Sequence, residues 1–452
     1  MGTDTVRETA SGASSALTDR RREQRGWYVY DWACSVYSTS VLTVFLGPYL
    51  TSVAKAAADA DGFVHPLGIP VRAGSFFAYT VSLSVILALF VMPLAGAAAD
   101  RTGRKKPLLA ASAYVGAAAT AGMFFLSGDR YLLGGALLVI ANASLAVSMV
   151  LYNSYLPQIA PPEERDAVSS RGWALGYASG ALVLLANLWL YTAHDTFGVS
   201  ESTAVRICLA SAGVWWGAFT VVPLRRLRDR RTAPGPGRTA PGFRHFAATV
   251  KDMRRYPLTL SFLLAYLVYN DGVQTVISQA SVYGSEELGL GQSTLIVAVL
   301  LVQVLAVAGA LAMGRFARAY GAKYTILGSL VAWTVTIGAG FFLPPKSPVW
   351  FFALAVGIGL VLGGTQALSR SLFSHLVPAG KEAEYFSAYE MSDRGMSWLG
   401  PLVFGLAYQL TGDYRDAIVS LVLFFLVGFA LLARVPVRQA VRDAGNPVPT
   451  RI

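Results

Sequence analysis

The sequence predicts an all-α integral membrane protein, a bundle of twelve transmembrane helices arranged as two six-helix halves. Of the 452 residues, 54% are hydrophobic and only 14% are charged, whereas soluble proteins carry roughly 25% charged residues. The apolar residues recur in blocks of roughly 20, the length that one helix needs to cross a hydrocarbon core of about 30 Å. A soluble protein could bury one or two such blocks, but it could not bury a dozen.

Each predicted helix is a long apolar block bounded by polar or turn-forming residues. The blocks place the transmembrane helices at 28–51, 75–98, 107–127, 131–153, 172–193, 204–223, 258–281, 293–314, 323–343, 349–372, 387–410 and 416–434. The domain organisation that follows is an N-terminal tail over 1–26, a first half over 27–223, a basic central loop over 224–257, a second half over 258–434 and a C-terminal tail over 435–452.

The positions of the charged residues orient the bundle. A net charge of +11 would suggest a nucleic-acid partner in a soluble protein, but here the charges lie between the apolar blocks. Most of the 37 lysines and arginines fall in the two tails, the central loop and every second connection between spans. Because such residues are retained on the cytoplasmic side, both termini are expected there. The arginines of the central loop are interpreted as topological anchors that contact anionic lipid, in preference to a nucleic-acid or partner site.

The two halves share weak sequence similarity. Four positions of the loop after the second span recur 218 residues later, since Gly96, Asp100, Gly103 and Lys105 correspond to Gly314, Arg318, Gly321 and Lys323. Two further pairs keep nearly the same offset, namely Leu156-Pro157 with Val377-Pro378 and Arg171-Gly172 with Arg394-Gly395. A common offset across three loops indicates duplication of a six-helix unit.

The loop after the second span combines a carboxylate and four cations with a glycine turn at the membrane surface. It reads Gly96-Ala97-Ala98-Ala99-Asp100-Arg101-Thr102-Gly103-Arg104-Lys105-Lys106. Such charges can pair with neighbouring helix ends in one conformation and separate in another. The loop resembles the signature of the major facilitator superfamily, apart from Ala98, where leucine is usual. This resemblance implies a major facilitator fold with Asp100, Arg101 and Arg104 in a conformational gate; a mere topological anchor is the alternative.

Further motifs, spread from about residue 27 to 434, are similar to those of the vacuole-effluxer family. They are Tyr30-Asp31-Trp32-Ala33, Asn153-Ser154-Tyr155-Leu156-Pro157, Ser169-Ser170-Arg171-Gly172-Trp173-Ala174-Leu175-Gly176-Tyr177, Tyr269-Asn270-Asp271-Gly272, Gly363-Gly364-Thr365-Gln366-Ala367-Leu368-Ser369-Arg370-Ser371 and Gly400-Pro401. The family is known for autophagy-related amino-acid exporters of fungal vacuoles and has many bacterial relatives. The resemblance implies a bacterial-type member that exports amino acids across the plasma (inner) membrane. Cys34 departs from the asparagine expected after Ala33, which bears on substrate range.

Polar groups inside the seventh span are the first candidates for a binding site. Asp271 lies about 13 residues into that span, roughly 20 Å along it and therefore near the bilayer centre. Asn270 is adjacent to it, and Gln274 follows one turn later. Because a carboxylate inside the membrane is costly, this cluster is predicted to bind the ammonium group of a solute or to carry a proton. A structural carboxylate bound to an arginine or a hydroxyl is the alternative.

Other polar residues lie mostly toward the predicted cytoplasmic side. Asp31, about one turn into the first span, is expected either to pair with an arginine or to bind cargo. A gate whose salt bridges break as the halves rock is predicted from five residues of spans ten and eleven: Gln366, Arg370, Glu390, Asp393 and Arg394. Arg370 could instead bind a substrate carboxylate. Asn142 in span four is a further candidate, for which interhelical hydrogen bonding is the default.

Glycines recur every four residues in two of the spans. Gly172, Gly176 and Gly180 do so in span five, and Gly359 and Gly363 in span ten. Small residues at this spacing allow close helix approach, so these faces are predicted to pack tightly or to slide.

Together these features favour secondary transport over catalysis. The four histidines have no metal-ligand spacing, and neither a phosphate-binding loop nor a nucleophile elbow occurs, so no enzyme activity, metal or cofactor is expected. The predicted function is alternating-access transport of a small polar solute, an amino acid by the resemblance, with protons as a candidate coupling ion. The alternatives are a carrier of sugars, organic acids or drugs, and a non-transporting membrane scaffold or sensor. Polar groups inside the bilayer favour transport over the scaffold.

Overall fold

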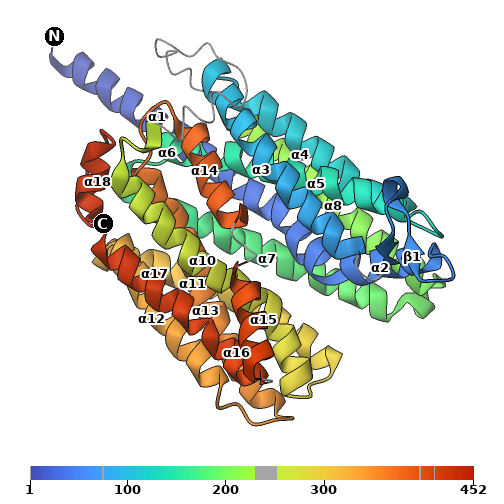
Figure 1. The fold of residues 1–452 in the computed structure, drawn as a ribbon. Helices are drawn as coiled ribbons and strands as arrows, with labels where there is room; N and C mark the ends of the chain where they lie inside the picture. The colour runs from blue at the N-terminus through green and yellow to red at the C-terminus, as the bar shows by residue number, and fades with distance from the viewer. Residues whose placement is uncertain (1, 74–75, 230–251, 396–398, 412) are drawn as a thin grey trace.

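The first half of the chain is a bundle of long helices (Figure 1). The computed structural model describes residues 2–73, 76–229, 252–395, 399–411 and 413–452. Helix α1 (Gly2–Val36) continues through a π-helical stretch (Tyr37–Phe45) into α2 (Leu46–Ala56). The other helices of this half are α3 (Phe76–Thr102), α4 (Lys105–Gly122), α5 (Tyr131–Asn153), the short α6 (Leu156–Ile159), α7 (Arg165–Thr192) and α8 (Glu201–Arg226).

A small antiparallel hairpin, β1 (Phe63–Val64) and β2 (Val71–Arg72), joins α2 to α3. Asp59 organises the chain that enters it, because its Oδ1 accepts hydrogen bonds from the backbone N–H groups of Asp61 and Phe63. Its Oδ2 lies 2.8 Å from Nε2 of His65, and this hydrogen bond lowers the pKa of Asp59.

The second half repeats the arrangement of long helices. Its elements are α10 (Pro257–Val282), α11 (Gln292–Tyr320), α12 (Ala322–Gly340), α13 (Pro348–His375), α14 (Glu382–Gly395), α15 (Leu399–Thr411), α16 (Tyr414–Ser420) and α17 (Val422–Arg434), followed by the short α18 (Val437–Asp443). Most of the central loop predicted over 224–257 lies outside the described residues, but α8 extends into it and ends at Arg226.

Ten helical segments of the described chain are long and apolar enough to cross a membrane. They coincide with ten of the twelve predicted spans. The ninth predicted span corresponds to α12, which has only 19 residues and carries Lys323 near its start. The eleventh corresponds to α14 and α15, which flank residues 396–398, outside the described part of the chain.

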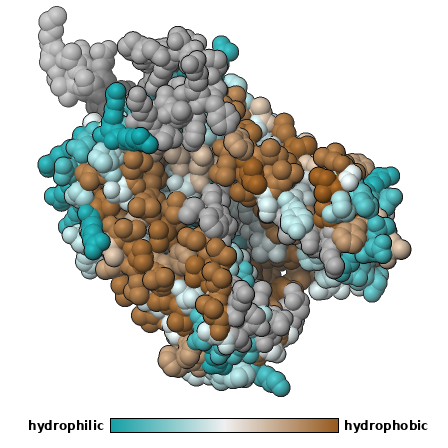
Figure 2. Space-filling model, viewed as in Figure 1, coloured by the Kyte–Doolittle hydropathy of each residue, from teal (hydrophilic) through white to brown (hydrophobic). Residues whose placement is uncertain are grey.

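Each half has its own apolar core. Large buried side chains such as Trp27 and Trp216 belong to the core of the first half, and Trp333 and Phe425 belong to that of the second. Apolar side chains also cover the outside of the helices, where Figure 2 shows broad hydrophobic surfaces. A helix that is apolar inside and outside is expected where lipid replaces water.

The two halves meet at one end of the bundle and diverge toward the other (Figure 1). We call the first the termini end, because the chain termini, α18 and the turn between α3 and α4 lie there. The opposite end, which carries the β1–β2 hairpin, is called the hairpin end.

Candidate functional site

A cavity of about 700 Å³ lies between the two halves. Its charged and amide side chains include six that gather toward the termini end: Asp31, Asn153, Gln366, Arg370, Glu390 and Asp393. Apolar lining residues such as Ile277, Leu295 and Phe351 come from helix ends nearer the hairpin end. Figure 2 shows the recess between the halves. The polar cluster is therefore the floor of a cavity that extends toward the hairpin end.

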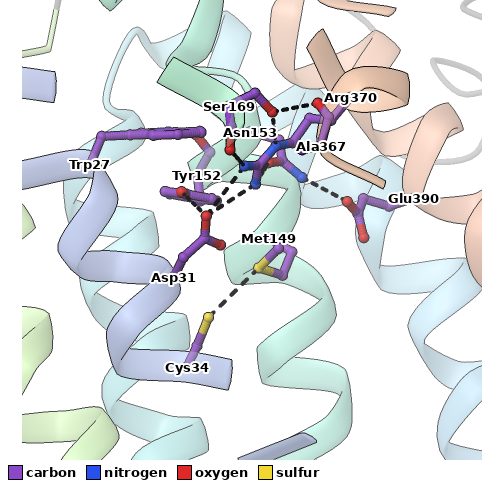
Figure 3. A network of polar contacts seen from close by, with 10 residues as sticks. All are labelled: Trp27, Asp31, Cys34, Met149, Tyr152, Asn153, Ser169, Ala367, Arg370 and Glu390. Carbon is purple, nitrogen blue, oxygen red and sulfur yellow. Dashed lines mark hydrogen bonds and ion pairs between the residues drawn. The ribbon is translucent and has the colours of Figure 1, made fainter. Parts of the chain in front are cut away.

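Arg370 of α13 is the centre of the floor (Figure 3). Its side chain is 1% exposed, and its guanidinium forms an ion pair with Asp31 of α1, at 3.3 Å from Nη2 to Oδ2. The same carboxylate oxygen accepts a hydrogen bond of 2.6 Å from the hydroxyl of Tyr152. Nε of Arg370 donates to the Ser169 hydroxyl at 2.9 Å, and that hydroxyl donates to the carbonyl of Ala367 at 2.6 Å. The pair thus joins the two halves.

Aromatic rings surround the guanidinium. Its central carbon lies 4.7 Å from the ring centre of Trp27, 5.3 Å from that of Trp173 and 5.6 Å from that of Tyr152. Trp27 and Tyr152 stack on each other, and the Trp27 indole N–H donates to the Tyr152 carbonyl. Cation–π attraction is strongest where water is excluded, so these rings hold Arg370 in one position.

A glycine stripe on α7 brings α1 to the cavity wall. A β-carbon at Gly172 would lie 2.5 Å from Oδ2 of Asp31, and one at Gly180 would lie 2.6 Å from the hydroxyl of Thr39. Gly176, between them, faces Ser35 in the same way. The predicted close approach of helices at this stripe is therefore present. It places the polar side chains of Asp31, Ser35 and Thr39 along the cavity wall.

A second polar network extends across the floor into the second half. Asn153 of α5 donates to Oε1 of Glu390 at 2.7 Å. On the same floor, Asn270 of α10 donates to Oδ1 of Asp393 at 2.6 Å and accepts from the amide of Gln366 at 2.7 Å. Four of the five predicted gate residues of α13 and α14, namely Gln366, Arg370, Glu390 and Asp393, therefore line one floor, together with Asn153 of α5 and next to Asn270 of the seventh span.

Nearer the termini end, a buried charge cluster joins α3 and α4 to α14. Nζ of Lys105 lies 3.4 Å from Asp100 and 3.2 Å from Glu382. Asp100 also accepts a hydrogen bond of 3.0 Å from the backbone N–H of Glu384, in the first turn of α14. Farther along the interface, Arg165 donates to the carbonyl of Ser374 at the end of α13, at 2.8 Å. These contacts close the termini end.

The predicted cluster of the seventh span is divided by the structure. Gln274 lines the cavity and Asn270 joins the floor, but Asp271 does not line the cavity. Asp271 is 3% exposed and lies beside α15, where its carboxylate has no close hydrogen-bond partner among the described residues. In this conformation the Asp271 side chain therefore lies on another face of α10 than the cavity-lining Gln274.

The remaining predicted residues lie apart from the floor or at its edge. Asn142 lines the cavity and donates to the hydroxyl of Ser84 at 2.6 Å, the interhelical bond expected by default. In the charge cluster, the cation that pairs with Asp100 is Lys105 rather than Arg101 or Arg104, and Arg104 is exposed. The side chain of Arg394 lies outside the described part of the structure.

Comparison with known proteins places this fold and site in a family. A family model described as "Vacuole effluxer Atg22 like" matches residues 19–445. The chain belongs to the vacuole effluxer Atg22-like family. The uncharacterized MFS-type transporter YxiO of Bacillus subtilis is 29% identical over 419 residues, which cover 92% of this chain and 95% of YxiO. Autophagy-related protein 22 of Yarrowia lipolytica is 28% identical over 463 residues, covering 83% and 78%.

Solved structures show the same fold. The fucose:proton symporter FucP of E. coli superposes with a TM-score of 0.68 at 12% identity, covering 92% of this chain and 97% of FucP. The family match, the likeness to YxiO and this shared fold together support a multi-pass membrane transporter of the major facilitator kind, as the sequence predicted.

Several residues of this Atg22-like site were not singled out from the sequence. They are Trp27, Lys105, Tyr152, Asn153, Arg165 and Ser169. Asn153 and Ser169 stand inside quoted family motifs, and Lys105 stands inside the signature loop, so a signal existed for these three. Periodicity carries no such signal for Arg165, because a lone arginine at a helix end is typical of a topological anchor.

Proposed function

We propose that this transporter carries an amino acid across a plasma membrane by alternating access, with both termini in the cytoplasm and protons as coupling ion. The observation that carries the proposal is the cavity floor, which combines the Arg370 guanidinium with the carboxylates of Asp31, Glu390 and Asp393. A zwitterion presents one group for each kind of partner. A sugar presents neither charge, so this floor supports amino acids over sugars.

Alternating access is supported by the unequal closure of the two ends. The termini end is held by buried ion pairs between the halves, while the cavity extends toward the hairpin end. Rocking of two rigid halves about the floor would exchange the closed and open ends. Basic side chains at the termini end, among them Lys105, Arg226 and Arg318, support a cytoplasmic location for it.

Proton coupling requires a carboxyl group that changes its protonation during the cycle. Asp271 is the residue we propose, because it is buried beside α15 with no close hydrogen-bond partner among the described residues. An ionised carboxylate is far more costly in such surroundings than a protonated one. Asp271 lies three residues along α10 from Gln274, which lines the cavity, so a change in its charge would act at short range on the cavity wall.

Counterflow in proteoliposomes tests the solute. Vesicles loaded with each amino acid, sugar or small organic acid in turn are diluted into a trace of the labelled compound, with and without an imposed pH gradient. We expect counterflow for one or more amino acids and none for sugars. Counterflow of sugars or organic acids alone would contradict the amino-acid assignment, and no flux of any solute would favour the scaffold alternative.

Asp271→Asn tests the coupling. We expect it to keep counterflow but to lose acceleration by the pH gradient, because a fixed neutral group no longer takes up a proton. Asp59→Asn, an exposed carboxylate in the loop before the hairpin, is the matched control and should keep that acceleration. Unchanged gradient dependence in Asp271→Asn would assign the proton to another group.

A further inference from the structure

All five N–H donors of Arg370 are already used in this conformation. Nε donates to the Ser169 hydroxyl at 2.9 Å, and Nη2 donates to the Ser169 carbonyl at 2.9 Å and to Asp31 at 3.3 Å. Nη1 donates to Asp31 and to the amide oxygen of Asn153, both at 3.3 Å. Every acceptor belongs to the other half of the protein. A solute in the cavity therefore finds no free donor on this guanidinium.

Asp31 occupies the place that a solute carboxylate would take. One oxygen, Oδ2, accepts from both terminal nitrogens of Arg370 and from the hydroxyl of Tyr152. Carboxylates are the preferred partners of a guanidinium, in part because one group can accept from both terminal nitrogens. Asp31 and Arg370 both line the cavity, so the pair stands where cargo would reach it.

Aromatic rings and the backbone of α7 enclose the guanidinium on several sides. The rings of Trp27, Trp173 and Tyr152 lie against the guanidinium. At Gly172 even a β-carbon would lie 2.5 Å from Asp31 and 3.1 Å from Nη2 of Arg370. A solute carboxylate can therefore bind Arg370 only by replacing Asp31.

We propose that Asp31 is an internal competitor for the carboxylate of the cargo. This inference rests on the proposed amino-acid transport. It identifies Asp31 as the group that makes the affinity for the solute differ between the state open at the termini end and the state open at the hairpin end. When the halves part at the termini end, Arg370 loses its acceptors together, because all of them belong to the other half, and its N–H donors become available. The carboxylate of a solute then replaces them. When the halves close again, Asp31 returns and displaces that carboxylate toward the hairpin end.

Two consequences follow for the solute. The free carboxylate is required, so an amino-acid amide is a poor ligand of the state that is open at the termini end. Affinity for the amino acid is lower in the conformation described here, where Asp31 holds Arg370, than in that other state. The gradient still sets the direction of net transport, while Asp31 sets the side on which the solute is released more readily.

Cys34 provides a native reporter of cavity occupancy. It lines the cavity one turn from Asp31, 3.9 Å from the sulfur of Met149, and 3% of its surface is exposed. The only other cysteine of the sequence, Cys208 in α8, is 0% exposed and lines no part of this cavity. The full chain carrying Cys208→Ser is placed in nanodiscs, and the rate of Cys34 alkylation by a maleimide is measured. The probes are a mixture of the common L-amino acids without cysteine, and the matched mixture of their amides.

For each mixture we measure the concentration that halves the rate of Cys34 alkylation. The quantity compared between variants is this concentration for the amides divided by that for the amino acids. Asp31→Asn should raise this ratio about tenfold, the size of one modest interaction. The amino acids bind more tightly once their competitor is removed, whereas the amides have no carboxylate to compete with Asp31 and bind as before. Tyr152→Phe keeps the ring but frees the Asp31 carboxylate from its hydroxyl, and it should move the ratio in the same direction by less. Asp31→Glu retains a carboxylate and should leave the ratio close to that of the parent.

Asn153→Ala is the matched control for simple loosening of the closed end. It removes one acceptor of Arg370 and the donor to Glu390 but keeps the Asp31 carboxylate on Arg370, so it should raise the ratio by less than Asp31→Asn does. A rise as large as that of Asp31→Asn would mean that loosening alone explains the effect, and it would overturn the competitor. An unchanged ratio in folded Asp31→Asn and Tyr152→Phe, with counterflow of amino acids intact, would overturn the competitor and leave the proposed function standing. Absence of both protection and counterflow by amino acids would instead overturn the proposed function.

Discussion

The turn between α3 and α4 and the turn between α11 and α12 are two copies of one loop with different tasks. Both turn through a glycine with positive φ, Gly103 at 62° and Gly321 at 90°, a conformation that favours glycine. Both are preceded by a glycine that touches the other half, since a β-carbon at Gly96 would meet Ala383 of α14 and one at Gly314 would meet Ser170 of α7. The two turns therefore share the same backbone features, as the predicted duplication would require.

The charged side chains of the two turns have diverged. In the first copy, Asp100 and Lys105 are buried and bind Glu382 and the N-terminal turn of α14. In the second copy, Arg318 replaces the carboxylate and is exposed. Lys323, the counterpart of Lys105, donates to the carbonyls of Ala433 and Val435, which end α17 of its own half.

The C-terminal tail occupies the surface that the second turn leaves. Arg451 donates to the carbonyl of Ala319 at 2.6 Å, and Ile452 lies against Gly321. Asn446 donates to the carbonyls of His375 and Val377, just beyond α13. One copy of the loop thus holds the two halves together, while the other is tied within its own half. Of the two turns, it is therefore the α3–α4 turn, and not its counterpart between α11 and α12, that supplies charged side chains to the closure of the termini end, although the two halves have similar folds.

The largest expected difference between the copies is for their lysines. Lys105→Met leaves the buried carboxylates of Asp100 and Glu382 facing each other, and breaking a buried ion pair costs about 3–5 kcal/mol. That cost falls on the closed conformation, so counterflow of the amino acid should drop by more than about tenfold. Lys323→Met, the matched change in the other copy, should alter counterflow by less than about twofold because it removes only helix-end bonds. Equal losses in the two variants would contradict the asymmetry.

The glycines before the two turns give a smaller and more specific effect. Gly96→Ala places a methyl group 2.6 Å from the Ala383 carbonyl oxygen, whereas Gly314→Ala places one 2.5 Å from the Ser170 hydroxyl. Each should disfavour the closed conformation by about 1–3 kcal/mol, the usual cost of overpacking.

Only the variant at the second turn, Gly314→Ala, is expected to regain activity through a second substitution. Ser170→Gly removes the side chain that clashes, so the double variant should regain counterflow. Ser387→Gly should not rescue Gly96→Ala, because the backbone carbonyl of Ala383 cannot be removed. Both double variants are compared by their counterflow per folded molecule. Rescue at both sites would show that the backbone of Ala383 moves aside as readily as the Ser170 side chain is removed, which would contradict the prediction.

Apolar blocks and loop charges were sufficient to predict the fold. Ten predicted spans coincide with membrane-length helices of the described chain, because hydropathy reports directly on lipid exposure. It reports poorly on α12, which is short and carries Lys323 near its start, and on α14, whose first turn contains the buried Glu382 and Glu384.

The sequence was sufficient to predict several residues of the site but not which of them contact each other. Arg370, Asp31 and Glu390 were candidates because charge inside a membrane is costly. That Arg370 would join Asp31 across the halves could not be read from residues 339 positions apart. Asp271 was placed by its depth along α10, and depth does not say which face of the helix meets the cavity.

The C-terminal tail should matter for stability more than for transport. Asn446→Ala removes two hydrogen bonds, of 2.9 and 2.8 Å, to the carbonyls of His375 and Val377. At about 1 kcal/mol each or less, their loss should lower the apparent Tm while counterflow per folded molecule stays within about twofold of the parent. Gln439→Ala, an exposed change in α18, is the control and should leave the Tm unchanged. A loss of transport in Asn446→Ala without a change in Tm would mean that the tail acts in the cycle.

The smallest effect is expected for an exposed ion pair at the same end. Arg228 lies 2.8 Å from Asp19, with side chains 61% and 48% exposed, in contrast to Lys105 and Asp100 at 5% and 1%. Solvent-exposed pairs contribute at most about 1 kcal/mol and are screened by salt, whose Debye length is about 10 Å at 0.1 M. Arg228→Ala should therefore leave counterflow unchanged in both low and high NaCl. The activity lost in Lys105→Met should likewise be insensitive to salt, because ions cannot enter the buried cluster to replace the missing ammonium. Recovery of Lys105→Met in high salt would show that the cluster is open to solvent, and the distinction between the two copies of the loop would then rest on Gly96 and Gly314 alone.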